Sequence, residues 1–191
     1  MKPFHFLCIM VLAVAVPLMA DSVSADGSYH EFLFGNVGSF AVSCAGGCLA
    51  TTNPVAEETS TPPWTFTGPG TIFALDLFQP GDEFAVYDNS ILLGDTSAPD
   101  PTAVDTCSGN IACAMADSGY SQGSFSVGGG SHSITIEVTQ SNQGGAAVFS
   151  VSGNAVPEPA SAALLLIGLG GITAWACRRS RQRDKLNAAA E

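Results

Sequence analysis

The basic residues of this chain all lie at its two ends, and this distribution constrains the chain most. Lys2 stands near the start, and the other five Lys and Arg residues fall between Arg178 and Lys185. Residues 26–156 contain no basic residue, whereas acidic residues recur along them, and the whole chain has a formal net charge of −11. Nucleic acid is therefore excluded as a partner of the central region, because phosphate contacts need Lys and Arg. With only 12% charged residues, the chain is neither a coiled coil nor a charge-rich disordered protein.

Residues 1–25 are predicted to form a signal peptide. Lys2 precedes an apolar run from Phe4 to Met19, which is the order of charge and apolar residues in a secretory signal. Small residues allow cleavage after Ala20 or after Ala25, and the second site fits the small-residue rule better. We therefore expect the mature chain to begin at residue 26, with an uncleaved N-terminal anchor as the alternative.

Near the other end, Ala160 to Cys177 is an uncharged stretch. As an α-helix it extends about 27 Å, enough to cross the hydrocarbon core of a bilayer. A basic cluster follows at once, and such clusters stay in the cytoplasm. We expect one transmembrane helix over 160–177, a basic cytoplasmic tail over 178–191 and an exported region over 26–155. A buried globular helix is the alternative.

Val156-Pro157-Glu158-Pro159 stands directly before this apolar stretch. Two prolines around one carboxylate favour an extended backbone that cannot continue a helix. Such a segment is exposed outside the membrane, where a processing enzyme can grip it. On composition alone it is a stiff linker that ends the domain.

Three features together resemble the C-terminal sorting signal of bacterial PEP-CTERM proteins. They are the Val-Pro-Glu-Pro motif at 156–159, a Leu- and Gly-rich stretch over 164–171, and two adjacent arginines. The resemblance implies recognition by an exosortase-type processing enzyme, an inner-membrane-anchored precursor, and a product at the cell surface or outside a Gram-negative bacterium. It makes exopolysaccharide a candidate partner. The residues it assigns are Pro157, Glu158 and Pro159 for recognition and Arg178 and Arg179 for retention. The tail runs on to Glu191, longer than is usual for this signal.

The central region reads as all-β. The clearest strand lies within 133–139, where apolar Ile134, Ile136 and Val138 alternate with Thr135 and Glu137, so that one face is buried. We predict an antiparallel β-sandwich, similar to a jelly roll, with a closed barrel as the alternative. The predicted strands are 29–34, 40–43, 71–78, 83–87, 91–93, 125–127, 132–139 and 146–151, and a turn at 79–82 links two of them.

Three segments of the central region, 81–88, 92–97 and 130–136, resemble a group of PEP-CTERM proteins whose ectodomain is a β-sandwich. The resemblance implies the fold and supplies no activity.

Four cysteines remain in the exported region: Cys44, Cys48, Cys107 and Cys113. An oxidising compartment favours disulfides, and the short separations favour Cys44 with Cys48 and Cys107 with Cys113. A zinc site is the alternative, although neither spacing is the usual C-x2-C and no histidine is adjacent.

Acidic residues crowd the predicted turns, and calcium takes oxygen ligands from such loops. Asp82, Asp88 and Asp95 are the candidate ligands, with plain surface charge as the alternative reading. No other cofactor is expected. A carbohydrate platform of Trp64, Tyr87 and Tyr120 is a second hypothesis, set against burial of these aromatic side chains in the core.

Catalytic motifs are missing from the exported region. His30 and His132 are its histidines, and neither lies in a Gly-x-Ser-x-Gly or His-Glu-x-x-His motif. We therefore expect no enzyme, no catalytic residue, and a surface or extracellular-matrix component associated with exopolysaccharide and biofilm. The alternatives are a carbohydrate- or calcium-binding adhesive module and a secreted hydrolase using a histidine or paired carboxylates such as Asp82 with Asp88.

Overall fold

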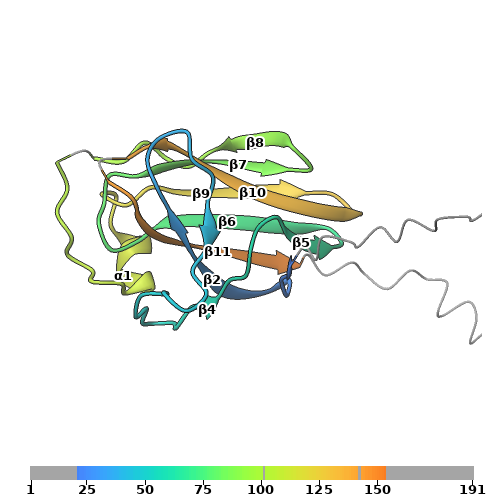
Figure 1. Ribbon diagram of the computed structural model, residues 1–191, viewed down its shortest axis with the longest axis horizontal. Helices are drawn as coiled ribbons and strands as arrows, with labels where there is room; N and C mark the ends of the chain where they lie inside the picture. The colour runs from blue at the N-terminus through green and yellow to red at the C-terminus, as the bar shows by residue number, and fades with distance from the viewer. Residues whose placement is uncertain (1–20, 101, 142, 154–191) are drawn as a thin grey trace, which may run out of the picture. The chain divides into compact units, whose positions relative to one another are not determined.

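Residues 21–100, 102–141 and 143–153 are described by the computed structural model, and they form a β-rich fold with one short helix (Figure 1). The predicted signal peptide apart from residues 21–25, and the whole predicted sorting segment 156–191, lie outside these ranges. The elements are β1 Asp21–Ser22, β2 Asp26–Phe34, β3 Val42–Ser43, β4 Glu57–Glu58, β5 Trp64–Thr67, β6 Gly70–Asp76, β7 Glu83–Asp88, β8 Ile91–Asp95, α1 Ile111–Ala116, β9 Gln122–Val127, β10 Ser131–Gln140 and β11 Gly145–Gly153.

The strands form two sheets. The first sheet has the order β1-β5-β10-β7-β8, and the second has the order β3-β2-β11-β6-β9, with β4 also pairing with β2. All pairs are antiparallel except β1 with β5 and β4 with β2. Buried residues of both sheets share one apolar cluster, so the described residues form the predicted sandwich and not the alternative barrel.

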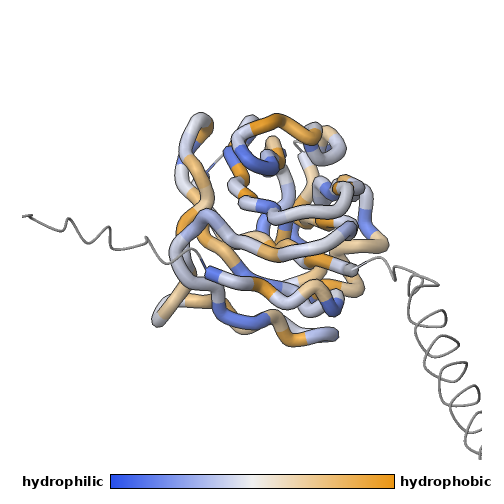
Figure 2. The backbone as a smooth tube through the Cα atoms, turned by 90° about the vertical axis from the view of Figure 1, so that its right-hand side faces the viewer, coloured by the Kyte–Doolittle hydropathy of each residue, from blue (hydrophilic) through white to orange (hydrophobic). Residues whose placement is uncertain are grey.

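Alternation along the strands fills this core. In β10, Ile134, Ile136 and Val138 are at most 1% exposed, whereas Thr135 and Glu137 lie partly in solvent. The face predicted from the sequence is therefore confirmed. Figure 2 shows the same pattern along the backbone, with apolar and polar residues alternating at short intervals.

Large aromatic side chains join the two sheets. Phe32 of β2 meets Phe84 of β7 edge to face, with ring centroids 5.7 Å apart. Trp64 of β5 packs on Phe149 of β11 at 4.6 Å. All four side chains are fully buried.

A second apolar cluster covers the outer face of the second sheet. Leu75 of β6 and Val148 of β11 are paired there, and Ile111 of α1 packs against them. The helix begins after Asn110, whose side chain accepts the N–H of Cys113 at 3.0 Å. Figure 1 shows α1 at the end of the sandwich opposite β5.

Two disulfides are present, Cys44–Cys48 and Cys107–Cys113, as the sequence predicted. The second one ties the start of α1 to the loop before it. Because all four sulfurs are bonded in pairs, the zinc alternative is wrong for these cysteines.

One predicted strand is divided between the sheets. Residues 40–43 were expected to form a continuous strand, but Ala41 donates its N–H to the carbonyl of Ile136 in β10, and only 42–43 pair with β2. The chain crosses here from one sheet to the other. A local pattern of residues cannot reveal such a crossing.

Four elements were missed. β5 directly follows two prolines and was not among the predicted strands. β1 and β4 have two residues each, and α1 is too short for helical periodicity to show. Among the described residues no helix is long and apolar enough to span a bilayer, and the predicted span 160–177 lies outside them.

Candidate functional site

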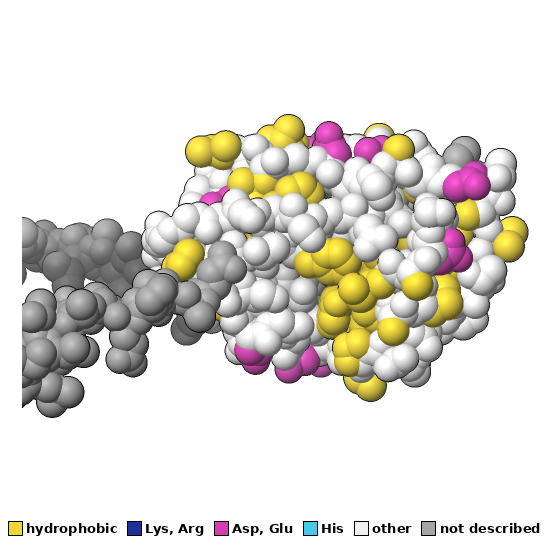
Figure 3. Space-filling model, turned by 180° about the vertical axis from the view of Figure 1, so that it is seen from behind, with side chains coloured by type: hydrophobic (Ala, Val, Ile, Leu, Met, Phe, Trp, Pro, Cys, Tyr) yellow, Lys and Arg dark blue, Asp and Glu magenta, His cyan; other side chains and the backbone are white. Residues whose placement is uncertain are grey.

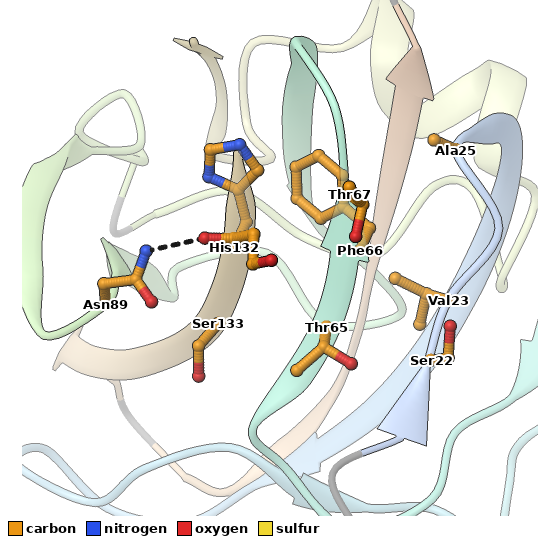
Figure 4. A pocket seen from close by; sticks show the side chains of 10 residues that line it. Ser22, Val23, Ala25, Thr65, Phe66, Thr67, Asn89, His132 and Ser133 are labelled. Atoms are coloured by element: carbon orange, nitrogen blue, oxygen red, sulfur yellow. Dashed lines mark hydrogen bonds between the residues drawn. The ribbon is translucent and has the colours of Figure 1, made fainter. Parts of the chain in front are cut away.

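A groove of about 470 Å³ lies where β1, β5 and the start of β10 come together (Figure 4). Its polar lining consists of hydroxyl and amide side chains and of His132. Val23, Ala25 and Phe66 supply the apolar part. No carboxylate lines the groove, so its lining suits an uncharged polar ligand.

Register places three hydroxyl groups side by side in this groove. Thr65 pairs with Ser22 on one side and with Ser133 on the other. Neighbouring residues Trp64 and Phe66 point into the core, so Thr65 faces outward. The result is a row of hydroxyl groups across three strands, visible in Figure 4.

His132 is fixed by hydrogen bonds at both ring nitrogens. Nδ1 lies 2.7 Å from Asp88 Oδ2, and Nε2 lies 2.9 Å from the carbonyl oxygen of Gly128. Both partners only accept hydrogen bonds when Asp88 is ionised, so this geometry suits an imidazolium with a proton on each nitrogen. The ring also stacks on Phe66, with centroids 4.6 Å apart.

The pKa of His132 follows from these contacts. Burial acts to lower it, but the hydrogen bonds to Asp88 and Gly128 and the negative charge of Asp88 raise it overall. An imidazole held in this way has no free nitrogen to serve as a general base.

We expect this contact to make stability depend on pH. The folded state raises the pKa of His132 above its usual value of about 6.5. The stability that protonated His132 contributes is therefore complete below that pH, and it is lost as the pH rises through the pKa of the folded state. Urea unfolding at a series of pH values should therefore show a declining free energy of unfolding on the alkaline side. Asp88→Asn should remove most of this decline, and an unchanged slope in the variant would contradict the assignment.

His30 lies in the second sheet and is in a different state. Its Nδ1 is 3.6 Å from Glu57 Oε2, its Nε2 is buried without a hydrogen-bond partner, and its ring lies 5.4 Å from that of Phe149. Burial lowers its pKa, although the charge of Glu57 opposes this. His30 is therefore a buried side chain whose lowered pKa favours the neutral imidazole.

The three candidate calcium ligands do not meet in one cluster. Asp88 is held by His132 and accepts the N–H of Ser133 at 3.1 Å. Asp95 is exposed at the end of β8. Asp82 is buried just before β7. Calcium binding by these residues as a set stays a prediction.

Glu31, Cys44 and Cys48 are close enough together to suggest a metal site within the described part of the chain. The two cysteines are joined in a disulfide, which removes their thiolates as ligands. Glu31 instead accepts the N–H of Leu49 at 2.6 Å. This group is structural.

Sequence reasoning missed Asp76, the last residue of β6. Its side chain is fully buried, and its Oδ2 accepts the N–H of Asp82 at 3.2 Å. Burial, followed by the charge of Asp82, raises the pKa of Asp76 to about 8. The available signal was a single carboxylate inside the apolar run 72–78.

The three aromatic candidates do not form a platform. Trp64 is fully buried, and Tyr120 is 1% exposed with its hydroxyl donating to Asp105 at 2.7 Å. Tyr87 is half-buried and donates to Glu137 at 2.8 Å. The core interpretation is therefore confirmed for Trp64 and Tyr120.

The predicted sorting residues lie outside the described ranges, so their assignment rests on sequence. Residues 155–181 match the PEP-CTERM protein-sorting motif, and this range contains Pro157, Glu158, Pro159, Arg178 and Arg179. The predicted resemblance is thereby confirmed. The match supports an exported protein that an exosortase-type enzyme sorts.

The other comparisons are less informative. No curated protein matches the chain. Among solved structures, the C-terminal CBM6 of LamC, a marine laminarinase from Zobellia galactanivorans, has 13% sequence identity and a TM-score of 0.32. The matched region covers 63% of this chain and 78% of the chain of that structure. Similarity at this level assigns neither fold nor ligand.

Proposed function

We propose that this protein is a non-enzymatic surface or extracellular-matrix component of an exopolysaccharide-producing Gram-negative bacterium. The β-sandwich is exported as part of a membrane-anchored precursor, and an exosortase-type enzyme then removes the C-terminal segment. The product carries an acidic, disulfide-linked domain to the cell surface or into the biofilm matrix.

The match of residues 155–181 to the sorting motif carries this proposal. The unit that contains the sandwich ends at Gly153, just before the match begins. Its two disulfides suit an oxidising location outside the cytoplasm. Figure 3 adds that, among the described residues, acidic side chains and no basic ones appear on the face seen from behind.

The states of the two histidines support the non-enzymatic part. A histidine general base needs a free nitrogen within reach of a nucleophile. Both ring nitrogens of His132 are engaged, and His30 is buried beside Phe149 and Glu57.

Intact-mass analysis of the exported protein tests the sorting step. We expect the wild-type product to end near 157–159, whereas Glu158→Ala should stay in the membrane fraction with residues 178–191 attached. Asp184→Asn is the matched control, because it changes a carboxylate outside the matched range. A wild-type product that keeps its basic tail would refute processing and leave a membrane-anchored protein.

Carbohydrate binding is the second candidate function, and the hydroxyl row of Ser22, Thr65 and Ser133 is the observation that favours it. Uncharged hydroxyl groups in a groove can exchange hydrogen bonds with sugar hydroxyls. Retention of the purified protein on an exopolysaccharide column would favour this adhesive function over a purely structural one.

A further inference from the structure

The outward-facing residues of β10 form a line of hydrogen-bonding groups on the first sheet. Ser133, Thr135 and Glu137 alternate with buried apolar residues, so their side chains leave the core on the same side of the sheet. All three are half-buried. Ser133 pairs with Thr65, so one end of this polar line joins the hydroxyl row of the groove. The polar line extends about 13 Å, which is longer than one sugar ring.

Two aromatic side chains flank the other end of the polar line. Tyr87 of β7 lies opposite Thr135, and Phe40 forms an isolated bridge with Glu137 at the other edge of β10. Their ring centroids are 6.3 Å apart, so the two rings approach each other across β10. Phe40 is 52% exposed, and the Tyr87 hydroxyl donates to Glu137 Oε2 at 2.8 Å. An exposed aromatic ring beside polar groups can pack on the apolar face of a sugar ring.

The hydroxyl groups of Ser133 and Thr135 have no hydrogen-bond partner within the described part of the chain. Hydroxyl groups in the core differ, since Thr96 donates to Ser121 at 3.0 Å. A half-buried hydroxyl that folding leaves unpaired can exchange hydrogen bonds with a ligand, because no internal hydrogen bond has to break first.

The charge of the domain restricts the class of ligand. The described residues contain no Lys or Arg, and their two histidines lie against carboxylates, His30 against Glu57 and His132 against Asp88. An anionic polysaccharide would therefore find no cation to pair with, and Glu137 would repel it at the polar line. An uncharged polysaccharide meets neither obstacle.

We propose that the outer face of the first sheet binds an uncharged polysaccharide, whose chain runs along β10 from the groove to Phe40 and Tyr87. Ser133 and Thr135 exchange hydrogen bonds with sugar hydroxyls, and Phe40 packs on the apolar face of a sugar ring. This inference rests on the second candidate function, carbohydrate binding, and adds to it the class of ligand and a second region of contact. It does not depend on the sorting step.

Affinity gel electrophoresis of the purified exported protein tests the class of ligand. Separate native gels contain hydroxyethylcellulose, dextran or galactomannan as uncharged polymers, and polygalacturonate as an anionic polymer. We expect at least one uncharged polymer to slow the protein and polygalacturonate to leave its migration unchanged. Migration that no polymer slows, or that polygalacturonate slows as much as any uncharged polymer, overturns the proposal. Sorting is judged separately, by intact mass.

Variants locate the binding face. Phe40→Ala should weaken binding about five- to tenfold, the range for one lost aromatic contact. Thr135→Val keeps the size of the side chain and removes its hydroxyl, and it should weaken binding about three- to fivefold. The matched controls are Val55→Ala and Ser126→Ala, at exposed residues outside the first sheet, and both should bind as the wild type does. Urea unfolding verifies that each variant is folded.

Weaker binding in either variant supports this location. If the wild-type protein binds and both Phe40→Ala and Thr135→Val bind equally well, carbohydrate binding stands and its assignment to this face is wrong. A second copy of the chain is the alternative occupant, and sedimentation of the wild-type protein tests it. We expect a monomer, and a dimer that Phe40→Ala dissociates would overturn the proposal.

Discussion

Replacing Trp64 by alanine should lower the free energy of unfolding by about 3–5 kcal/mol, the range for large aromatic residues removed from a core. The indole packs on Phe149 at 4.6 Å and lies 5.8 Å from Phe32, so its loss leaves a cavity between the two sheets. Its Nε1 also donates to the carbonyl of Ser60 at 3.1 Å. Urea unfolding of the purified protein measures the change.

Phe40→Ala is the matched control. Phe40 is 52% exposed and approaches Tyr87 on the outer face of the first sheet, so its removal should change stability by about 0.5 kcal/mol or less. If Trp64→Ala left stability unchanged and instead reduced retention on a polysaccharide, Trp64 would belong to a binding surface and its position in the core would be wrong.

A chain that begins at residue 26 should be less stable by about 2–4 kcal/mol than one that begins at Asp21. Val23 is 7% exposed and belongs to the main core, and its N–H donates to the carbonyl of Thr65 at 2.9 Å. The carbonyl of Ala25 accepts the N–H of Gly153 at 2.8 Å. Shortening the chain removes all of these contacts together with one wall of the groove.

The same contacts bear on the processing site. The sequence favoured cleavage after Ala25, yet residues 21–25 contain β1 and help to close the core. We therefore expect cleavage after Ala20 and a mature N-terminus at Asp21. N-terminal sequencing of the exported protein decides this point, and a first residue of Asp26 would show that the sandwich matures without β1.

Strands in which apolar and polar residues alternate over several positions could be predicted, because this period of two is a local property of the sequence. The buried face of β10 followed from spacing, and both disulfide pairs followed from spacing together with the expected oxidising compartment. Short elements could not be predicted in this way. Two-residue strands such as β1 exist only because a partner strand lies beside them, and the stretch 40–43 divides between sheets for the same reason.

The candidate sites show the same limit. From the sequence, Asp88 was a candidate calcium ligand in a turn. In the structure its Oδ2 is instead hydrogen-bonded to His132, a residue far along the chain. Asp76 drew no attention in the sequence, although its carboxylate is fully buried with Oδ1 unpartnered and its pKa is raised to about 8 by burial. Partners of this kind depend on which strands pair, and strand pairing is a long-range property.

The sequence by itself determined where the charges lie, where the longer alternating strands lie and that the C-terminal end carries a sorting motif, because each is a local or compositional property. Only the tertiary structure decided which carboxylates have partners, that Trp64 lies in the core and that residues 21–25 belong to the sandwich. Burial and hydrogen bonding arise between strands from distant parts of the chain. The acidic residues within 26–156 have no Lys or Arg in that range to pair with, so their partners come from the way the strands are brought together.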